Sequence, residues 1–417
     1  MSDKKRIYIW GSGNGLGSVL KSLDFDLIRI EGLIDNNIEK VGMRVSGFEV
    51  ILPNRIDKSV DYIIIAALYS YQRIKTQLIA YGYNEKRIIS YYDKYDIIDN
   101  QQINFLNTTL RTCELIEIEL KYSLNKINNL EYEIADRIKN DEYKFPIIKN
   151  ATECLQDLIK NSSSLCRFGD GEFEMIMGRE RPEFQSPNKV LSKRLREILT
   201  CSSSKPLIGI ADNYGDLTKY TKIAQNGIRT YMTSNVRKEH LEVLDLNKVY
   251  YDAYVSRPYI IYQDKEYAKR IFDLWKKLWN QRDIVIVEGE LLRCGYKNDL
   301  FDNVNSIGRI LCESRNAWNQ YDKIFSFVIE NISKDKLILI ALGPTATVLA
   351  YDLSELGYQA IDMGQLDNEY EWYLRNAEEQ VNITYKYVSE YGVLGQIVDD
   401  IDDKEFKNQI IAKIKDS

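Results

Sequence analysis

Histidine is almost missing from this chain of 417 residues, which contains only His240. A mechanism that needs a pair of histidine ligands or a Ser-His-Asp triad therefore has one candidate, and its charged neighbours predict a surface position. The six cysteines show no paired spacing, which argues against a disulfide framework and against a zinc cluster.

The chain also lacks a basic excess and a long apolar run. A net charge of -6 argues against nucleic acid as the main partner. The apolar runs are strand-length and fall short of the roughly 18–20 residues that span a bilayer, and no signal-peptide core follows the first residues. With 44% hydrophobic residues, the composition indicates a cytoplasmic globular protein of two or three domains.

Residues 1–97 alternate apolar strands with helical segments, which predicts a small Rossmann-like α/β domain. A glycine-rich turn at 11–17 follows the first strand, but Leu16 stands where the dinucleotide fingerprint has its third glycine. The turn and Asp35 could hold a nucleotide, or the turn could be purely structural.

Residues 98–145 contain neither glycine nor proline, and their apolar residues recur every three or four positions. This spacing predicts one long helical linker. Such a helix can be a spacer, a helical hairpin or a coiled-coil stalk, so a homodimer through 98–145 is one possible assembly.

Residues 146–395 predict a second α/β unit, and 396–417 a charged helical tail. Nearly every polar cluster of this unit follows an expected strand. Open α/β sheets bind ligands beyond the carboxyl ends of their strands, so these clusters predict a catalytic cleft. The expected strands are 164–168, 206–211, 249–255, 283–288, 336–342 and 359–363.

The stretch 167–172 has the clearest chemistry. Asp170 and Glu172 flank a glycine after an apolar strand, and two such carboxylates suit a divalent cation shared with phosphates. Arg167 could fork onto phosphate oxygens, and Gly169 permits close backbone approach. The competing interpretation is an acidic turn that caps the next helix.

Other segments offer ligand contacts. Gly343 and Thr345 stand between a strand and a helix, where helix amides favour a diphosphate. Asn298 and Asp299 could bind sugar hydroxyls, or Asp299 could cap a helix. Further cations for phosphate are Arg257 and Arg309, although surface ion pairs are the alternative.

A second acidic cluster comprises Asp367, Glu369 and Glu371. If it opens a helix, Asp367 and Glu371 share one face and Glu369 points elsewhere. Mutual repulsion would raise one pKa and make a general base, whereas the alternative is again a preference for the helix start.

Taken in order, these motifs resemble the GT-D-fold glycosyltransferase family of bacteria. Known active members transfer a sugar from a UDP-sugar, typically UDP-glucose, to a glycan on a bacterial surface protein. The resemblance covers about 150–390 and rests on 167–172, 184–185, 257–259, 298–301, 342–345 and 362–372.

The resemblance implies that Asp170 and Glu172 hold Mn²⁺ or Mg²⁺ against UDP, that Gln185 belongs to the donor site, and that Glu371 is the first choice of base. Gln365 departs from the family pattern, because a histidine is expected there and glutamine cannot titrate.

The leading hypothesis is thus a metal-dependent glycosyltransferase with a UDP-sugar donor, inverting in outcome, that moves a hexose to a surface glycan or glycoprotein. One alternative is an NAD-dependent oxidoreductase or epimerase of nucleotide sugars. Another is a non-enzymatic docking module for glycan assembly, formed by the first domain and the long helix.

Overall fold

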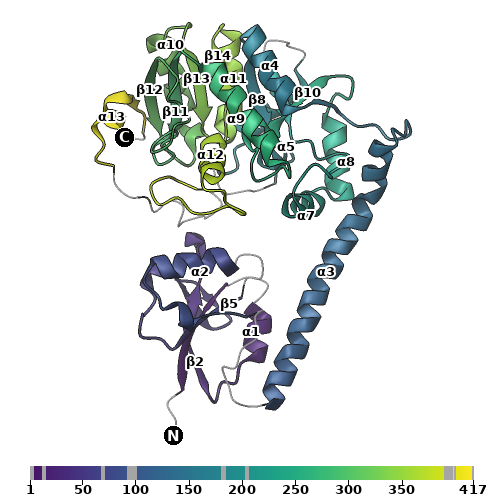
Figure 1. Cartoon of the computed structure of the whole chain (residues 1–417), viewed down its shortest axis with the longest axis vertical. Helices are drawn as coiled ribbons and strands as arrows, with labels where there is room; N and C mark the ends of the chain where they lie inside the picture. The colour runs from purple at the N-terminus through teal and green to yellow at the C-terminus, as the bar shows by residue number, and fades with distance from the viewer. Residues whose placement is uncertain are drawn as a thin grey trace. The chain divides into compact units, whose positions relative to one another are not determined.

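The computed structural model describes residues 4–11, 16–66, 71–91, 101–179, 185–201, 206–388, 398 and 401–415, with the side chains of 101–115 left aside. The chain forms two compact units. One comprises 1–121 with 391–394, and the other comprises 122–390 with 395–417. Figure 1 traces the chain through both.

The first unit is built on a six-stranded sheet of order β3-β4-β2-β1-β5-β6. All its pairs are parallel except the β3–β4 hairpin, which the sequence pattern did not predict. The mostly parallel sheet confirms the Rossmann-like expectation. Its elements are β1 Lys5–Trp10, α1 Leu16–Ser22, β2 Ile28–Ile34, β3 Arg44–Val45, β4 Phe48–Ile51, β5 Tyr62–Ile65, α2 Tyr71–Ala80 and β6 Ile88–Ser90.

The glycine-rich turn that could hold a nucleotide is only partly described, since 12–15 lie outside the described residues. Asp35, at the end of β2, accepts from the Asn37 amide at 2.9 Å and pairs with Lys40 at 3.1 Å. These contacts support the structural interpretation of Asp35.

A single helix, α3, spans Gln101–Arg137. Its C-terminal part belongs to the second unit and packs beside helices α7 Lys222–Tyr231 and α8 Ser234–Val243 (Figure 1). Arg229 of α7 is the main link, because its guanidinium pairs with Glu133 at 2.7 Å while both side chains are buried.

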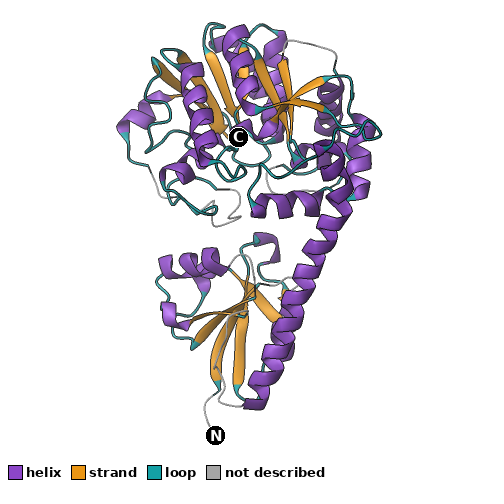
Figure 2. Ribbon diagram, turned by 45° about the vertical axis from the view of Figure 1, so that its right-hand side comes forward, coloured by secondary structure: helices purple, strands orange, loops and turns teal. Residues whose placement is uncertain are grey.

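The second unit holds a nine-stranded, fully parallel sheet of order β15-β12-β11-β13-β14-β8-β9-β10-β7, with helices on its faces (Figure 2). Its strands are β7 Ile147–Lys149, β8 Ser164–Phe168, β9 Pro206–Ile210, β10 Val249–Asp252, β11 Asp283–Gly289, β12 Ser306–Cys312, β13 Leu337–Ala341, β14 Gln359–Asp362 and β15 Ile410–Lys413. The remaining helices are α4 Ala151–Asn161, α5 Asp170–Ile176, α6 Lys189–Thr200, α9 Lys265–Trp279, α10 Tyr321–Asn331, α11 Pro344–Glu355, α12 Leu366–Leu374 and α13 Lys404–Gln409.

Three strands of this sheet, β7, β12 and β15, are absent from the sequence prediction. Residues 306–312, from which the sequence predicted only a cation for phosphate, form β12 between β11 and β15. The expectation of a wholly helical tail is wrong, because 410–413 pair with β12 and extend the sheet. β15 is short, and the Gly308-Arg309 step interrupts the apolar run of β12.

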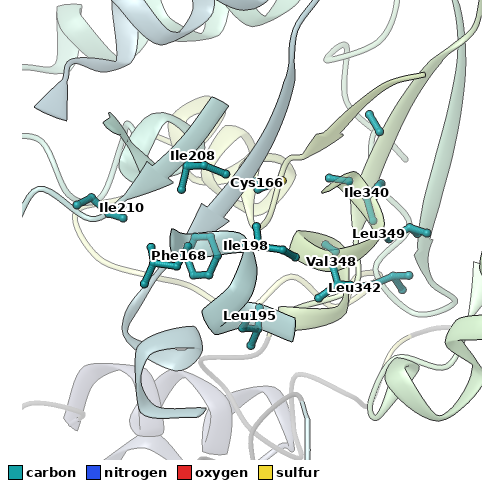
Figure 3. Packing of buried hydrophobic residues seen from close by; sticks show 14 of the residues in the cluster. Cys166, Phe168, Leu195, Ile198, Ile208, Ile210, Ile340, Leu342, Val348 and Leu349 are labelled. Atoms are coloured by element: carbon teal, nitrogen blue, oxygen red, sulfur yellow. The ribbon is translucent and has the colours of Figure 1, made fainter. Parts of the chain in front are cut away.

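The core of this unit includes an apolar cluster to which β8, β9, β13, α6 and α11 contribute (Figure 3). Phe168 closes β8 inside this cluster with no exposed surface, and Leu195 of α6 is equally buried. Because the chain turns immediately after Phe168, this packing fixes the position of the acidic turn that follows.

We predict that Leu195→Ala lowers the free energy of unfolding by about 2–5 kcal/mol, because it opens a cavity in this cluster. Val190→Ala is the matched control on the same helix, since Val190 is 63% exposed. Urea unfolding followed by tryptophan fluorescence measures both, and equal effects would contradict the packing described.

Candidate active site

The candidate site lies where the strand order reverses. From β8 the chain continues outward to β9 and β10, whereas β14, the neighbour of β8 on the other side, is reached from β13. Such a switch point leaves a crevice at the carboxyl ends of the two strands. The parallel sheet therefore brings the segments after β8, β9, β13 and β14 to one edge, as the sequence predicts.

Arg167 and Asp362 span this switch point. The Arg167 guanidinium pairs with the Asp362 carboxylate at 2.7 Å and also donates to the Asp362 carbonyl at 2.8 Å. Gly364 passes so close to Arg167 that a Cβ there would lie 2.0 Å from the guanidinium. Arg167, predicted as a phosphate ligand, is thus engaged in joining β8 to β14.

The acidic pair opens α5. Asp170 is exposed and its Oδ1 accepts from the Gly171 amide at 2.9 Å, while the half-buried Glu172 accepts from the Gly169 amide through Oε2 at 2.8 Å. The interpretation of this turn as a helix cap is therefore correct, because both carboxylates accept from amides at the start of α5.

The chemistry of this donor set fits a hard cation. Burial, and then the charge of Asp362, raise the pKa of the Glu172 carboxyl to about 7. A bound cation would favour the ionised form, and Mg²⁺ is usually held by one or two carboxylates together with substrate phosphates. Among the described residues, no group of three or more His, Cys, Asp or Glu is arranged to hold a metal.

The start of α11 adjoins the same crevice. The Thr347 hydroxyl donates to the Arg167 carbonyl at 2.9 Å, which ties the first turn of α11 to β8. Gly343, before the helix, has a φ of 55°, a conformation that glycine adopts without strain. The Thr345 side chain is fully buried, yet its Oγ1 has no hydrogen-bond partner among the described residues.

The second acidic cluster is entirely buried on α12. As predicted, Asp367 and Glu371 share a face. Both carboxylates accept hydrogen bonds from the side-chain amide nitrogen of Asn298, at 2.9 and 2.8 Å. Lys386 lies between them, with 2.7 Å to Asp367 and 2.8 Å to Glu371.

The raised pKa expected of a general base is wrong for Glu371. Burial opposes ionisation of Glu371, but Lys386 and then the hydrogen bonds from Arg375 and Asn298 outweigh it and lower the pKa of the carboxyl. Lys386 is fully buried and supplies the charge that turns repulsion into attraction. A carboxylate held this way has low proton affinity, which argues against a general-base role for Glu371.

Glu369 points away from that pair and fixes a neighbouring loop. Its Oε2 accepts from the amides of Tyr259 and Ile260, each at 2.9 Å, and Oε1 lies 3.4 Å from Arg257. Glu369 is fully buried, so its role in this structure is to order the segment after β10.

The remaining predicted ligands also have structural partners. Arg309 is buried between Glu288, at 2.5 Å, and the Cys294 carbonyl, so its assignment as a phosphate cation is wrong. Asp299 caps no helix but pairs with Lys276 at 2.7 Å.

Two glutamines that the family resemblance singled out also have partners within the protein. Gln185 is buried and accepts from the Trp318 amide at 3.2 Å, while Gln365, in the place of the expected histidine, accepts from Asn368 at 3.0 Å.

The surface position expected for His240 is wrong. Its ring is 2% exposed and stacks on Phe173 of α5 with centroids 3.8 Å apart. Hydroxyls of Tyr214 and Tyr231 lie 2.9 and 3.1 Å from its two nitrogens. Burial lowers the pKa of His240 to about 4, so the neutral ring supports the helix that carries Asp170.

Sequence reasoning gave no individual role to two further acids on this edge. Asp362 is the last residue of β14, and nothing in the local sequence names Arg167 as its partner. Asp252 ends β10 in full burial, where desolvation and then Asp212 raise the pKa of its carboxyl to about 6. Both acids close their strands, so the carboxyl end of an expected strand was the available signal.

Two known protein families match parts of this sequence. The family described as "Glycosyltransferase GT-D fold" matches residues 165–391, which is more than half of the chain. The chain belongs to the GT-D-fold glycosyltransferase family. A second family, "C2185-like, N-terminal", matches residues 3–89.

Two curated relatives are similar to somewhat less than two thirds of this GT-D protein. A "Probable glycosyl transferase Gly" of Streptococcus gordonii is 38% identical over 263 residues, which are 63% of this chain and 38% of that protein. "Glycosyltransferase GlyD" of Streptococcus pneumoniae serotype 4 is 37% identical over 268 residues, 64% of this chain and 32% of that protein. The chain thus spans about a third of the length of these curated relatives.

Solved structures agree with this assignment. A structure titled "A New Glycosyltransferase (DUF1792) from Streptococcus sanguinis" has a TM-score of 0.61 and 35% identity, covering 65% of this chain and all of the other. Another, described as a conserved domain with "a distinct glycosyltransferase fold", has the same TM-score, with 36% identity over 64% of this chain and 95% of the other. None of the described helices is long and apolar enough to cross a membrane.

The charge pattern on α12 predicts a pH effect on stability. Because the folded pKa of Glu371 lies below its unfolded value, its pairing stabilises the fold above about pH 4.3 and is lost as pH falls through the folded pKa. Glu371→Gln should therefore reduce stability at pH 7 by about 1–3 kcal/mol and flatten its acid dependence.

Urea unfolding between pH 3 and pH 7 checks this expectation. Glu330→Gln on α10 is the control, since Glu330 is exposed. An acid dependence as steep in Glu371→Gln as in the natural protein would contradict the ion-pair assignment.

Proposed function

We propose that this protein is a cytoplasmic, metal-dependent glycosyltransferase that moves a hexose from a UDP-sugar to a hydroxyl of a bacterial surface glycan or glycoprotein. The observation that carries the proposal is the acidic pair Asp170 and Glu172 at the switch point of the parallel sheet. Membership of the GT-D family supports the reaction class.

The diphosphate of the donor would lie between two helix starts. α5 follows β8 and α11 follows β13, and these strands are two positions apart in the sheet, which corresponds to about 10 Å. The amides of the first turn of α11 favour an anion. The buried hydroxyl of Thr345 has no hydrogen-bond partner in the part of the chain that the structure describes, so a donor phosphate could supply one.

Asp170 and Glu172 would hold Mn²⁺ or Mg²⁺. When bound, such an ion neutralises charge on the departing UDP. Glu172 is then required as a carboxylate, and the amide of Gly169 already holds one of its oxygens in place. Arg167 keeps this turn against Asp362, so in this proposal it positions the ligands and does not contact phosphate itself.

In this proposal the acids of α12 do not contact the transferred sugar but position the residues around it. Asp367 accepts from the Gly295 amide at 2.8 Å, and Asn298 is bonded to both Asp367 and Glu371. We assign this network to ordering the 294–298 turn. An acceptor hydroxyl that attacks in line with the leaving UDP would bond to the anomeric carbon as the bond from that carbon to the diphosphate oxygen breaks, and its proton would pass to water. The anomeric carbon is then inverted, which is the outcome we propose.

Donor binding tests the proposal directly. Isothermal titration should show that the protein binds UDP with Mn²⁺ and that EDTA weakens this binding at least tenfold. Asp170→Asn should have the same effect as EDTA, because it removes a ligand charge. Asp273→Asn, an exposed acid on α9, is the matched control.

Titrations with ADP and NAD complete that experiment. Tight binding of NAD without binding of UDP would favour a nucleotide-sugar oxidoreductase instead. Binding of UDP that is equally tight in Asp170→Asn and in EDTA would refute the metal assignment.

A second variant tests the diphosphate position. Thr345→Val should leave stability unchanged, since the hydroxyl has no partner to lose, and should weaken UDP binding about fivefold, the value of roughly one hydrogen bond. Thr347→Val, which breaks the bond to the Arg167 carbonyl, should instead lower the unfolding midpoint. UDP affinity unaffected by Thr345→Val would place the diphosphate away from α11.

A further inference from the structure

Helix α3 has two faces of opposite character. One face packs on its own unit, where Asn129 and Glu133 are each 2% exposed and contact Arg229. Residues two apart on an α-helix are turned by about 200°, so Ile127 points away from the face of Asn129. Ile127 is 65% exposed.

The outward face carries a continuous apolar stripe. Large aliphatic side chains recur along it every three or four residues, and each is between 38% and 67% exposed. Monomeric proteins rarely leave so much contiguous apolar surface in water. The stripe comprises Ile116, Leu120, Leu124, Ile127, Leu130, Ile134 and Ile138.

The stripe follows the seven-residue period of a coiled coil. Counting from Leu120, an apolar residue recurs every seven positions over five repeats, at Leu106, Cys113, Leu120, Ile127 and Ile134. These are a positions. Ile116 and Leu130 take d, whereas the d residues at 109, 123 and 137 are polar and Leu124 and Ile138 take the adjacent e position. An apolar a position sustained over several repeats, with an apolar d or e residue after it, indicates a coiled-coil seam.

Charges beside the stripe fit one arrangement of partners. In this register Lys126 is at g and Glu131 is at the following e, and both are exposed. In a parallel two-stranded coiled coil, g of one helix meets the next e of the other, so Lys126 of each chain would meet Glu131 of its partner. Within its own chain Glu131 has a long hydrogen bond of 3.3 Å from Tyr143.

From these observations we propose that α3 pairs with α3 of a second copy of this chain in a parallel, in-register coiled coil. The seam is the apolar stripe, and it leaves the face toward α7 and α8 unchanged. The interaction is independent of the donor site, so it stands or falls separately from the proposed function.

Sedimentation velocity of the full chain tests the proposal. The natural protein should sediment as a dimer at micromolar concentration, and the double variant Ile127→Lys with Ile134→Lys should sediment as a monomer with unchanged UDP binding and circular dichroism. Ile223→Lys is the matched control, because Ile223 is 71% exposed on α7 and lies outside the stripe. A monomeric natural protein, or a double variant that remains dimeric, would overturn the proposal.

Charge exchange tests the parallel register. Lys126→Glu alone and Glu131→Lys alone should each weaken the dimer, since like charges then face each other. A mixture of the two variants should form the heterodimer, in which each pair is again of opposite charge. Variants that dimerise as well alone as when mixed would overturn the parallel register.

Discussion

The ion pair between Arg167 and Asp362 is the constraint on which the candidate site depends. It joins β8 and β14 at the place where the strand order reverses, and both side chains are mostly buried, with 16% and 4% of their surface exposed. Removing one partner of a buried pair leaves an uncompensated charge, which is far more costly than losing a surface contact. The turn with Asp170 and Glu172 follows this junction directly, so its position is set by the pair and by Phe168 beneath it.

Elsewhere in the second unit, charged residues that the sequence suggests as catalytic or ligand-binding groups stabilise the fold instead. Lys386 pairs with two acids of α12, and Glu288 pairs with Arg309. Glu369 accepts hydrogen bonds from two backbone amides of a loop. Each of these groups is buried and satisfied. The acids of α5 differ, because they open a helix at the crevice and Glu172 carries a raised pKa. For this reason the proposed metal and diphosphate sites are assigned to the starts of α5 and α11.

The features that the sequence could predict are those with local or periodic signals. The apolar runs of β8, β9 and β13 indicate buried parallel strands, the breaker-free stretch around α3 indicates a long helix, and residues after the strands mark one edge. Partner choice has no such signal. Lys386 lies 19 residues from Asp367, and Arg309 lies 21 residues from Glu288, so only the fold brings the charges together. His240 misled for the same reason, because its polar neighbours in sequence are not its neighbours in space.

The central claim is that Asp170 and Glu172 grip a cation shared with the donor diphosphate. Crystals grown with Mn²⁺ and UDP, measured at a wavelength where manganese scatters anomalously, would locate the ion directly. The account predicts an anomalous peak within coordination distance of both carboxylates, with the diphosphate between the peak and the start of α11. A manganese peak elsewhere in the crevice, with Asp170 and Glu172 bonded only to the amides of their own helix, would contradict it.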